Sequence, residues 1–130
     1  MYVIPLADSP EEEKYLFSFY CVERVLPNFE RIYPQDPSLR QVLETVHRSL
    51  SGRATLEELK AAAVVAALVN LRIHSVCTAY APTNTSTMRQ RSAYDAAGAV
   101  WRLADRQMSN MIGAAALCSA IWAHRAENPD

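Results

Sequence analysis

Apolar residues recur three and four positions apart along almost the whole chain, and this spacing constrains the fold more than any other feature. It places an apolar stripe on one face of a helix, where the helix packs against a core. No segment shows the strict polar–apolar alternation, flanked by turn residues, that is typical of a half-buried strand. We therefore predict an all-α protein: a single compact bundle or orthogonal stack of four to five helices over residues 1–130.

The first predicted helix begins at Pro10, with Ser9 as its N-cap and Glu12 as the second residue of a capping box. Pro27 lacks the amide hydrogen that would bond back to residue 23, so we expect a kink or a restart there. Pro34 then ends the helix. The apolar stripe of this helix comprises Tyr15, Phe19, Val22, Leu26, Phe29 and Tyr33.

Two further helices follow from the same kind of signal. Asp36 and Pro37 cap a second helix that stops at Gly52, and Thr55 with Glu58 opens a long alanine-rich third helix. Because the third helix is apolar around most of its circumference, we expect it to lie at the centre of the bundle. The buried side of the second helix comprises Leu39, Val42, Leu43, Val46 and Leu50.

Residues 82–87 are polar turn formers and predict a loop before the last two helices. We expect residues 1–8 and 126–130 to be flexible. The stripe of the fourth helix comprises Tyr94, Ala97, Trp101, Ala104 and Met108. The last helix carries small residues that permit close approach of a neighbour, namely Gly113, Ala114, Ala115, Ala116 and Ala120.

Composition excludes several classes of protein. The chain has 13 Lys and Arg against 14 Asp and Glu, a net charge of -1, so we expect no nucleic-acid partner. Its three cysteines are an odd number without a C-x-x-C pair, which does not fit a secreted disulfide scaffold. No positive segment precedes an apolar run at the N-terminus, and no apolar stretch reaches the roughly 20 residues of a membrane span. These features predict a cytoplasmic protein without a membrane partner.

Residues able to support chemistry are few. His74 and Cys77 are three positions apart and share a helix face, and Cys118 is the remaining candidate metal ligand. We interpret them as small buried thiols and a partly exposed imidazole, and we expect no metal and no cofactor. No serine or cysteine has an adjacent base, so we predict no catalytic residue and no enzymatic activity.

One segment resembles a known family. It spans Cys21–Glu30, with the sequence CVERVLPNFE, and continues with Tyr33–Asp36 and Arg40. This segment is similar to the N-terminal part of the immunity-protein-five-like family, small bacterial immunity proteins of polymorphic toxin systems. The turn at Gly52 and the alanine-rich helix after it look like the family's short turn and alanine-heavy second half. The resemblance implies a protein that neutralises a toxin by binding and covering it. It carries over no catalytic residue.

We therefore expect a non-catalytic protein-binding module whose partner is another protein, and the resemblance implies that this partner is a toxin domain. Residues 1–60 carry seven Lys and Arg against ten Asp and Glu, and an acidic face suits a toxin with a basic active surface. Two alternatives stay open: a helical homodimeric scaffold sealed by the apolar second half, and a small helical metal-dependent enzyme using His74, Cys77 and Cys118. The candidate partner-binding residues are Glu11, Glu12, Glu13, Glu23 and Glu30.

Overall fold

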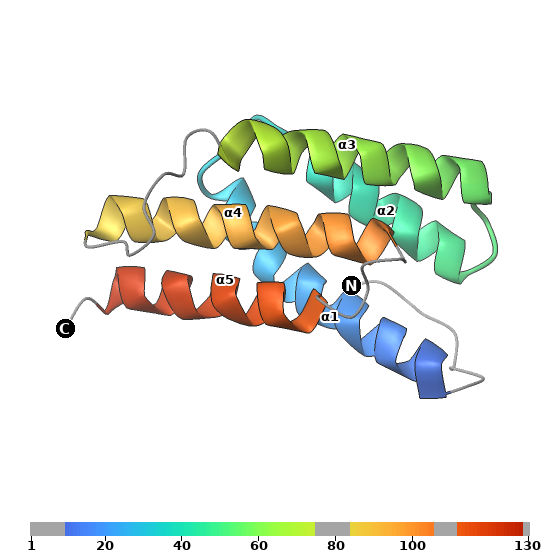
Figure 1. The fold of residues 1–130 in the computed structure, drawn as a ribbon, viewed down its shortest axis with the longest axis horizontal. Helices are drawn as coiled ribbons and strands as arrows, with labels where there is room; N and C mark the ends of the chain where they lie inside the picture. The colour runs from blue at the N-terminus through green and yellow to red at the C-terminus, as the bar shows by residue number, and fades with distance from the viewer. Residues whose placement is uncertain (1–9, 75–83, 106–111, 129–130) are drawn as a thin grey trace.

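The computed structural model describes residues 10–74, 84–105 and 112–128, and these residues form five helices and no strand (Figure 1). The prediction of an all-α bundle is confirmed. The helices are α1 (Pro10–Glu30), α2 (Ser38–Leu50), α3 (Leu56–His74), α4 (Thr85–Ala104) and α5 (Ile112–Glu127).

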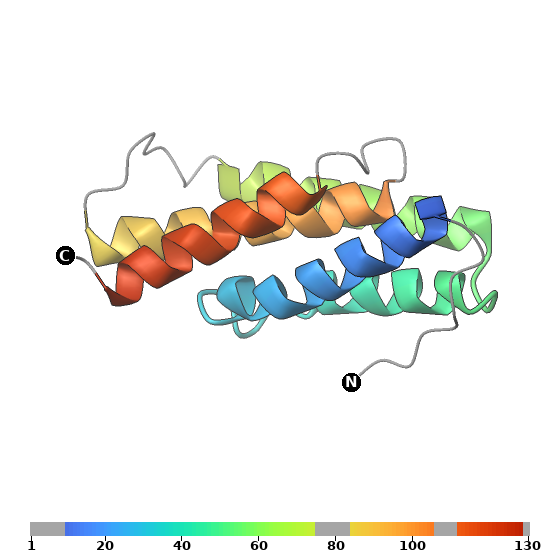
Figure 2. The ribbon, with the colours of Figure 1, turned by 90° about the horizontal axis from the view of Figure 1, so that it is seen from below.

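The helices form two layers around α4. In Figure 1, α3, α4 and α5 lie side by side, with α4 in the middle, and Figure 2 shows α1 and α2 in the layer behind them. α4 packs against all four of the other helices, whereas α3 packs mainly against α2 and α4. The central helix is therefore rich in alanine, as predicted, but it is α4 and not α3. Apolar composition alone did not distinguish a helix enclosed within the chain from one at its edge.

The predicted stripes of α1 and α2 form much of the core. On α1, Phe19, Val22, Leu26 and Phe29 are fully buried. Of the kink or restart expected at Pro27, the restart does not occur, because α1 continues through this residue as one helix and ends at Glu30. Pro27 stands in the last turn, where its missing amide hydrogen removes a single helical hydrogen bond. The residues that α2 buries are Leu39, Val42, Leu43 and Val46.

The turn between α2 and α3 is built by the residues that the sequence indicated. Gly52 has a φ of 73°, a conformation that side-chain-bearing residues rarely adopt. The Arg53 amide donates to the Arg48 carbonyl at 2.7 Å, as in a Schellman motif that closes a helix. Thr55 and Glu58 form the predicted capping box, since each backbone amide donates to the other side chain at 3.1 Å. These local bonds fix where α2 ends and α3 begins.

α4 begins earlier than predicted. Asn84 is its N-cap, and the Asn84 side chain accepts a hydrogen bond from the Thr87 amide at 2.9 Å. The Thr87 hydroxyl accepts in return from the Asn84 amide at 3.4 Å. Residues 85–87 therefore form the first turn of α4 rather than a loop. The sequence signal was a capping box with threonine in the place where glutamate or glutamine is usual.

A buried polar pair joins α4 to α5. The Ser92 hydroxyl donates to the Ser119 carbonyl at 2.7 Å, and the Ser119 hydroxyl donates to the Ser92 carbonyl at 2.8 Å. Asn28 of α1 donates to the Ser119 hydroxyl at 3.1 Å, so three helices meet at this point. Small side chains here let α4 and α5 approach closely. Ala120, expected at this contact, is exposed instead, and the neighbouring Ser119 is buried.

The structure describes most of the C-terminal end of the chain but not its first nine residues. The predicted N-cap Ser9 and residues 1–8 lie outside the described residues, as does Met108 of the apolar stripe predicted for the fourth helix. At the other end, α5 runs through Glu127, and Ala126 is only 4% exposed. The last helix thus extends into the segment 126–130 that was expected to be flexible.

Candidate functional site

Of the five acidic residues predicted to bind a partner, the three whose side chains the structure describes do not lie on one side of α1. Glu11 and Glu12 stand in the first turn of α1, and their side chains lie outside the described part of the chain. Glu13 is exposed, whereas Glu23 and Glu30 are half-buried. Glu23 and Glu30 share a side of α1 that is turned by about 80–100° from Glu13, at 3.6 residues per turn.

Glu30 is also paired within the chain. Arg40 of α2 donates to its two carboxylate oxygens at 2.6 and 3.1 Å, which is a bidentate pair. A carboxylate held in this way presents little free negative charge to a partner. Among the α1 carboxylates that the structure describes, Glu13 is therefore the most exposed.

Two exposed aromatic residues on α1 were not predicted from the sequence. Phe17 is 70% exposed and Tyr20 is 44% exposed. They stand three residues apart, on the same side of the helix as the exposed charges of Glu13 and Arg24. We refer to these four residues as the α1 outer face. Exposed aromatic side chains beside polar ones are typical of surfaces that bind another protein. The available signal was the position of Phe17, which falls off the buried stripe.

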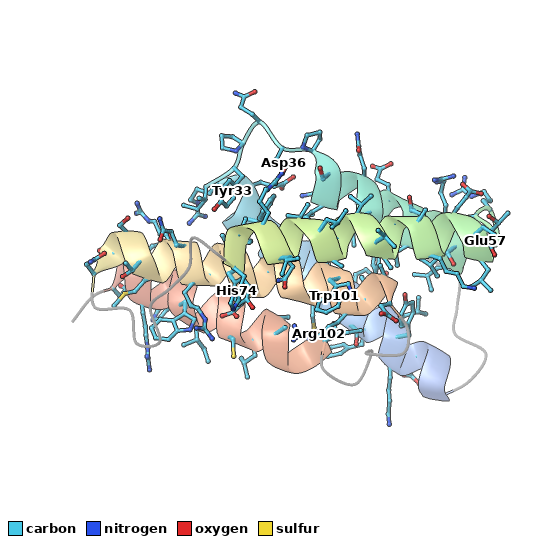
Figure 3. All side chains as sticks on the ribbon, turned by 45° about the horizontal axis from the view of Figure 1, so that its top comes forward. Tyr33, Asp36, Glu57, His74, Trp101 and Arg102 are labelled. Atoms are coloured by element: carbon cyan, nitrogen blue, oxygen red, sulfur yellow. The ribbon has the colours of Figure 1, made fainter. Side chains whose placement is uncertain are left out.

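A second exposed surface is apolar and belongs to α3. Val64, Leu68 and Leu71 are 57%, 60% and 69% exposed, and Ala61 is exposed beside them. We refer to these four residues as the α3 outer face. A hollow of about 610 Å³ runs along its edge, and its walls include Lys60, Ala63 and Val64 of α3 and Trp101 of α4. Figure 3 shows α3 in front of the other described helices, with Trp101 on α4 beside it.

The two described residues of the candidate metal site, His74 and Cys118, stand on different helices. His74, at the end of α3, is exposed and lies with its ring 5.5 Å from that of Tyr94. Cys118 is exposed on α5, on the opposite side of α4 from α3 (Figure 1). Cys77 lies outside the described residues. Within residues 10–74, 84–105 and 112–128, no group of three His, Cys, Asp or Glu could hold a metal ion.

Two aspartates carry shifted pKa values in opposite directions. Burial by itself raises the pKa of Asp36, but hydrogen bonds from Ser38 and Arg72 and the charge of Arg72 bring that pKa below its ordinary value. The Arg72 guanidinium lies 2.6 Å from the Asp36 carboxylate. Burial raises the pKa of Asp95 above its ordinary value, and the nearby charges of Arg91 and Arg102 offset this only in part. The folded protein thus favours the charge on Asp36 and disfavours the charge on Asp95.

These shifts predict opposite effects of two matched substitutions on stability. The charge of Asp36 stabilises the fold above the carboxyl's unfolded pKa, and this contribution is lost as pH falls through the lower folded pKa. For Asp95 the charge costs stability above its raised folded pKa, and the cost vanishes as pH falls below the unfolded pKa. We expect Asp36→Asn to lower the free energy of unfolding near pH 7, and Asp95→Asn to raise it.

Urea denaturation of both variants and the unsubstituted chain at about pH 7 and about pH 3 measures this difference. Both effects should shrink toward the lower pH. Equal effects of the same sign in the two variants, or differences that do not change with pH, would contradict the assignment.

The described residues define a class of protein. They form a small helical domain with exposed aromatic and apolar side chains on α1 and α3, and they include no group of three potential metal ligands. None of its described helices has the length and apolar character needed to cross a membrane.

The family follows from comparison of the sequence with known proteins. Residues 5–81 match the family described as "Imm-5 like putative immunity protein", and the chain belongs to this family. The matched region includes α1, α2 and α3, and therefore both exposed faces. Comparison with curated proteins and with solved structures gives no match.

Proposed function

We propose that this protein neutralises a bacterial toxin in the cytoplasm by binding it and covering its active site, without catalysing a reaction. Membership of the immunity-protein family carries this proposal. Occlusion needs only a rigid surface of standard size, about 800 Å² on each partner. The α1 outer face and the α3 outer face both lie within the part that matches the family.

The α1 outer face is the surface that best fits a toxin. α1 is tied to the bundle along its length, because the Tyr15 hydroxyl donates to the Leu103 carbonyl at 2.6 Å and Asn28 donates to Ser119 at 3.1 Å. A surface that is already ordered loses little conformational entropy on binding. Phe17 and Tyr20 supply the aromatic side chains that commonly dominate binding energy at such interfaces.

Charge on α1 would act mainly on the rate of association. Glu13 is exposed at the N-terminal end of the α1 outer face, and Glu11 and Glu12 precede it in the chain. Negative charge at the edge of an interface speeds the encounter with a basic partner and makes the rate depend on salt. We propose that the acidic residues named from the sequence serve this steering role, with Glu30 contributing least because Arg40 holds it.

One alternative function has an observation in its favour. The exposed apolar α3 outer face fits the homodimeric scaffold better than an isolated monomer. Pairing through α3 and toxin binding through α1 use different helices, so one does not exclude the other. The metal-dependent enzyme gains no comparable support, since His74 belongs to α3 and Cys118 to α5, and these helices lie on opposite sides of α4 (Figure 1).

Binding to a toxin identified among the products of the neighbouring genes tests the proposal. Phe17→Ala and Tyr20→Ala should each weaken binding by roughly 30-fold or more, which corresponds to the loss of about 2 kcal/mol at a central aromatic contact. Leu117→Ala is the control, because Leu117 is 61% exposed but lies on α5. Surface plasmon resonance on the purified pair measures all three. If both aromatic variants bind the toxin as tightly as the unsubstituted chain does, the α1 outer face is excluded as the binding surface. If the unsubstituted chain does not bind the toxin, the proposed function is excluded.

Charge reversal tests the steering role separately. Reversing all five acidic residues should slow association and reduce its dependence on salt, with a smaller change in dissociation. Glu13→Lys can be compared with Glu44→Lys, since Glu44 is exposed on α2 rather than α1. An unchanged association rate and salt dependence would rule out the acidic face.

A further inference from the structure

α3 carries two apolar stripes, and the other described helices cover only one of them. The buried stripe packs against α2 and α4 and comprises Leu59, Ala62, Ala66, Val69 and Ile73. The α3 outer face lies on the opposite side of the helix, and no other described helix passes over it in Figure 3. A helix that is apolar all round is normally enclosed on all sides. The outer stripe is therefore the part of α3 that still requires a partner.

The spacing of the α3 outer face is that of a coiled-coil contact. Ala61, Val64, Leu68 and Leu71 are separated by three, four and three residues, the heptad pattern by which two helices interlock their side chains. We propose that this face binds α3 of a second copy of the chain, in antiparallel orientation about a two-fold axis. This inference does not depend on toxin binding.

The charged residues at the two ends of α3 favour a second copy of α3 as the partner, in antiparallel orientation. The first turn of α3 carries Glu57 and Glu58, and its last turn carries Arg72 and His74. Glu58 lies 3.3 Å from Arg48 and Arg72 lies 2.6 Å from Asp36 within the chain, so each end keeps only part of its charge for a second copy. Figure 3 shows Glu57 and His74 toward the two ends of the helix. In an antiparallel pair the acidic end of each copy meets the basic end of the other, twice by symmetry. The helix dipoles also oppose one another favourably. A parallel pair would place acidic residues against acidic residues.

The antiparallel register is self-complementary in size as well. With the axis near residue 66, Ala61 lies opposite Leu71 of the second copy, and Val64 lies opposite its Leu68. A small residue thus faces a large one at each end of the contact. Val65, which is 41% exposed, flanks the contact near the axis and meets Val65 of the second copy. The hollow between α3 and Trp101 adds apolar surface along one edge.

The oligomeric state in solution tests the proposal. Sedimentation velocity of the full chain over a wide range of concentration should show a monomer–dimer equilibrium. Leu68→Glu and Leu71→Lys should each raise the dissociation constant on the order of a hundredfold, because every substitution enters the symmetric interface twice. Both side chains are exposed in one copy, and circular dichroism verifies that the variants fold. Leu117→Glu, on α5, should leave the dimer unchanged.

A monomer at every concentration would overturn the proposal, as would a dimer that survives both α3 substitutions. Binding of the α3 outer face only to the toxin, with no self-association, would overturn it as well.

Cross-linking tests the direction of pairing. In a chain whose three native cysteines are replaced by alanine, Val65→Cys should form an intermolecular disulfide on mild oxidation. Glu57→Cys should not, because the two copies of residue 57 stand roughly 27 Å apart along an antiparallel pair, at 1.5 Å per residue. A disulfide through Glu57→Cys would show parallel pairing and contradict the proposed geometry. Absence of a disulfide through Val65→Cys would contradict the proposed register.

Discussion

Phe19→Ala is expected to lower the free energy of unfolding by about 3–5 kcal/mol, the range for removing a buried phenylalanine side chain. Phe19 has no exposed surface and stands in the core beside Val22, and its ring lies 6.1 Å from that of His47 on α2. Truncation would leave a cavity where α1 meets α2. Such a loss is a large share of the 5–15 kcal/mol that stabilises a typical domain.

Phe17→Ala is the matched control for this prediction. Phe17 is on the same helix, two residues away, and is 70% exposed. Its truncation should change the free energy of unfolding by no more than about 0.5 kcal/mol. Urea denaturation followed by circular dichroism measures both variants. Similar destabilisation of the two would mean that α1 presents a different face to the core.

Ser119→Leu is expected to have the next largest effect, a loss of about 2–4 kcal/mol from overpacking and from lost hydrogen bonds. The Ser119 hydroxyl is fully buried between α4 and α5, where it donates to the Ser92 carbonyl. It also accepts from Asn28, whose amide group would lose this partner. A leucine side chain at this position would have to push α5 away from α4.

Ala120→Leu tests whether the effect belongs to the interface rather than to α5 itself. Ala120 follows Ser119 directly and is exposed. An added leucine side chain there should change stability by no more than about 0.5 kcal/mol. Thermal unfolding of the two variants gives the comparison. A larger loss for Ala120→Leu than for Ser119→Leu would contradict the way α5 faces α4.

Much of the fold could be predicted because its signals are local. The stripe from Phe19 to Phe29, the positive φ of Gly52 and the capping box of Thr55 and Glu58 each depend on residues within one or two turns. The start of α4 was misplaced although its signal was local, because the Asn84 capping box uses threonine as its second residue.

The position of α3 could not be predicted from composition. Both of its stripes are apolar, so its sequence favoured a central helix, and only the packing of α4 against the other four helices shows which helix is enclosed. The apolar circumference of α3 is explained if the second stripe binds outside the chain. A pattern typical of a core helix can therefore also indicate an interface.

The candidate site was predicted only in part. The sequence directed attention to α1 through its acidic residues, but Glu30 proved to be paired with Arg40 across the turn to α2. That pairing depends on how α1 and α2 are placed, which spacing along the chain does not reveal. Phe17 and Tyr20 were missed because an aromatic residue in a helical pattern is more often part of a core.

The two proposed surfaces have a joint consequence. α1 and α3 lie in different layers of the bundle (Figure 2), so a dimer formed through α3 would leave both copies of the α1 outer face exposed. Each copy could then bind one toxin.

The central claim is that this immunity protein acts by occupying the toxin rather than by chemistry, and a titration of toxin activity tests it most directly. Increasing amounts of the purified chain are added to a fixed amount of its toxin, well above the dissociation constant. Activity should fall linearly and reach zero at one chain per toxin, because each bound chain covers one active site. Complete inactivation by a small fraction of one equivalent would show catalysis and contradict the claim, and so would full activity in the presence of excess chain.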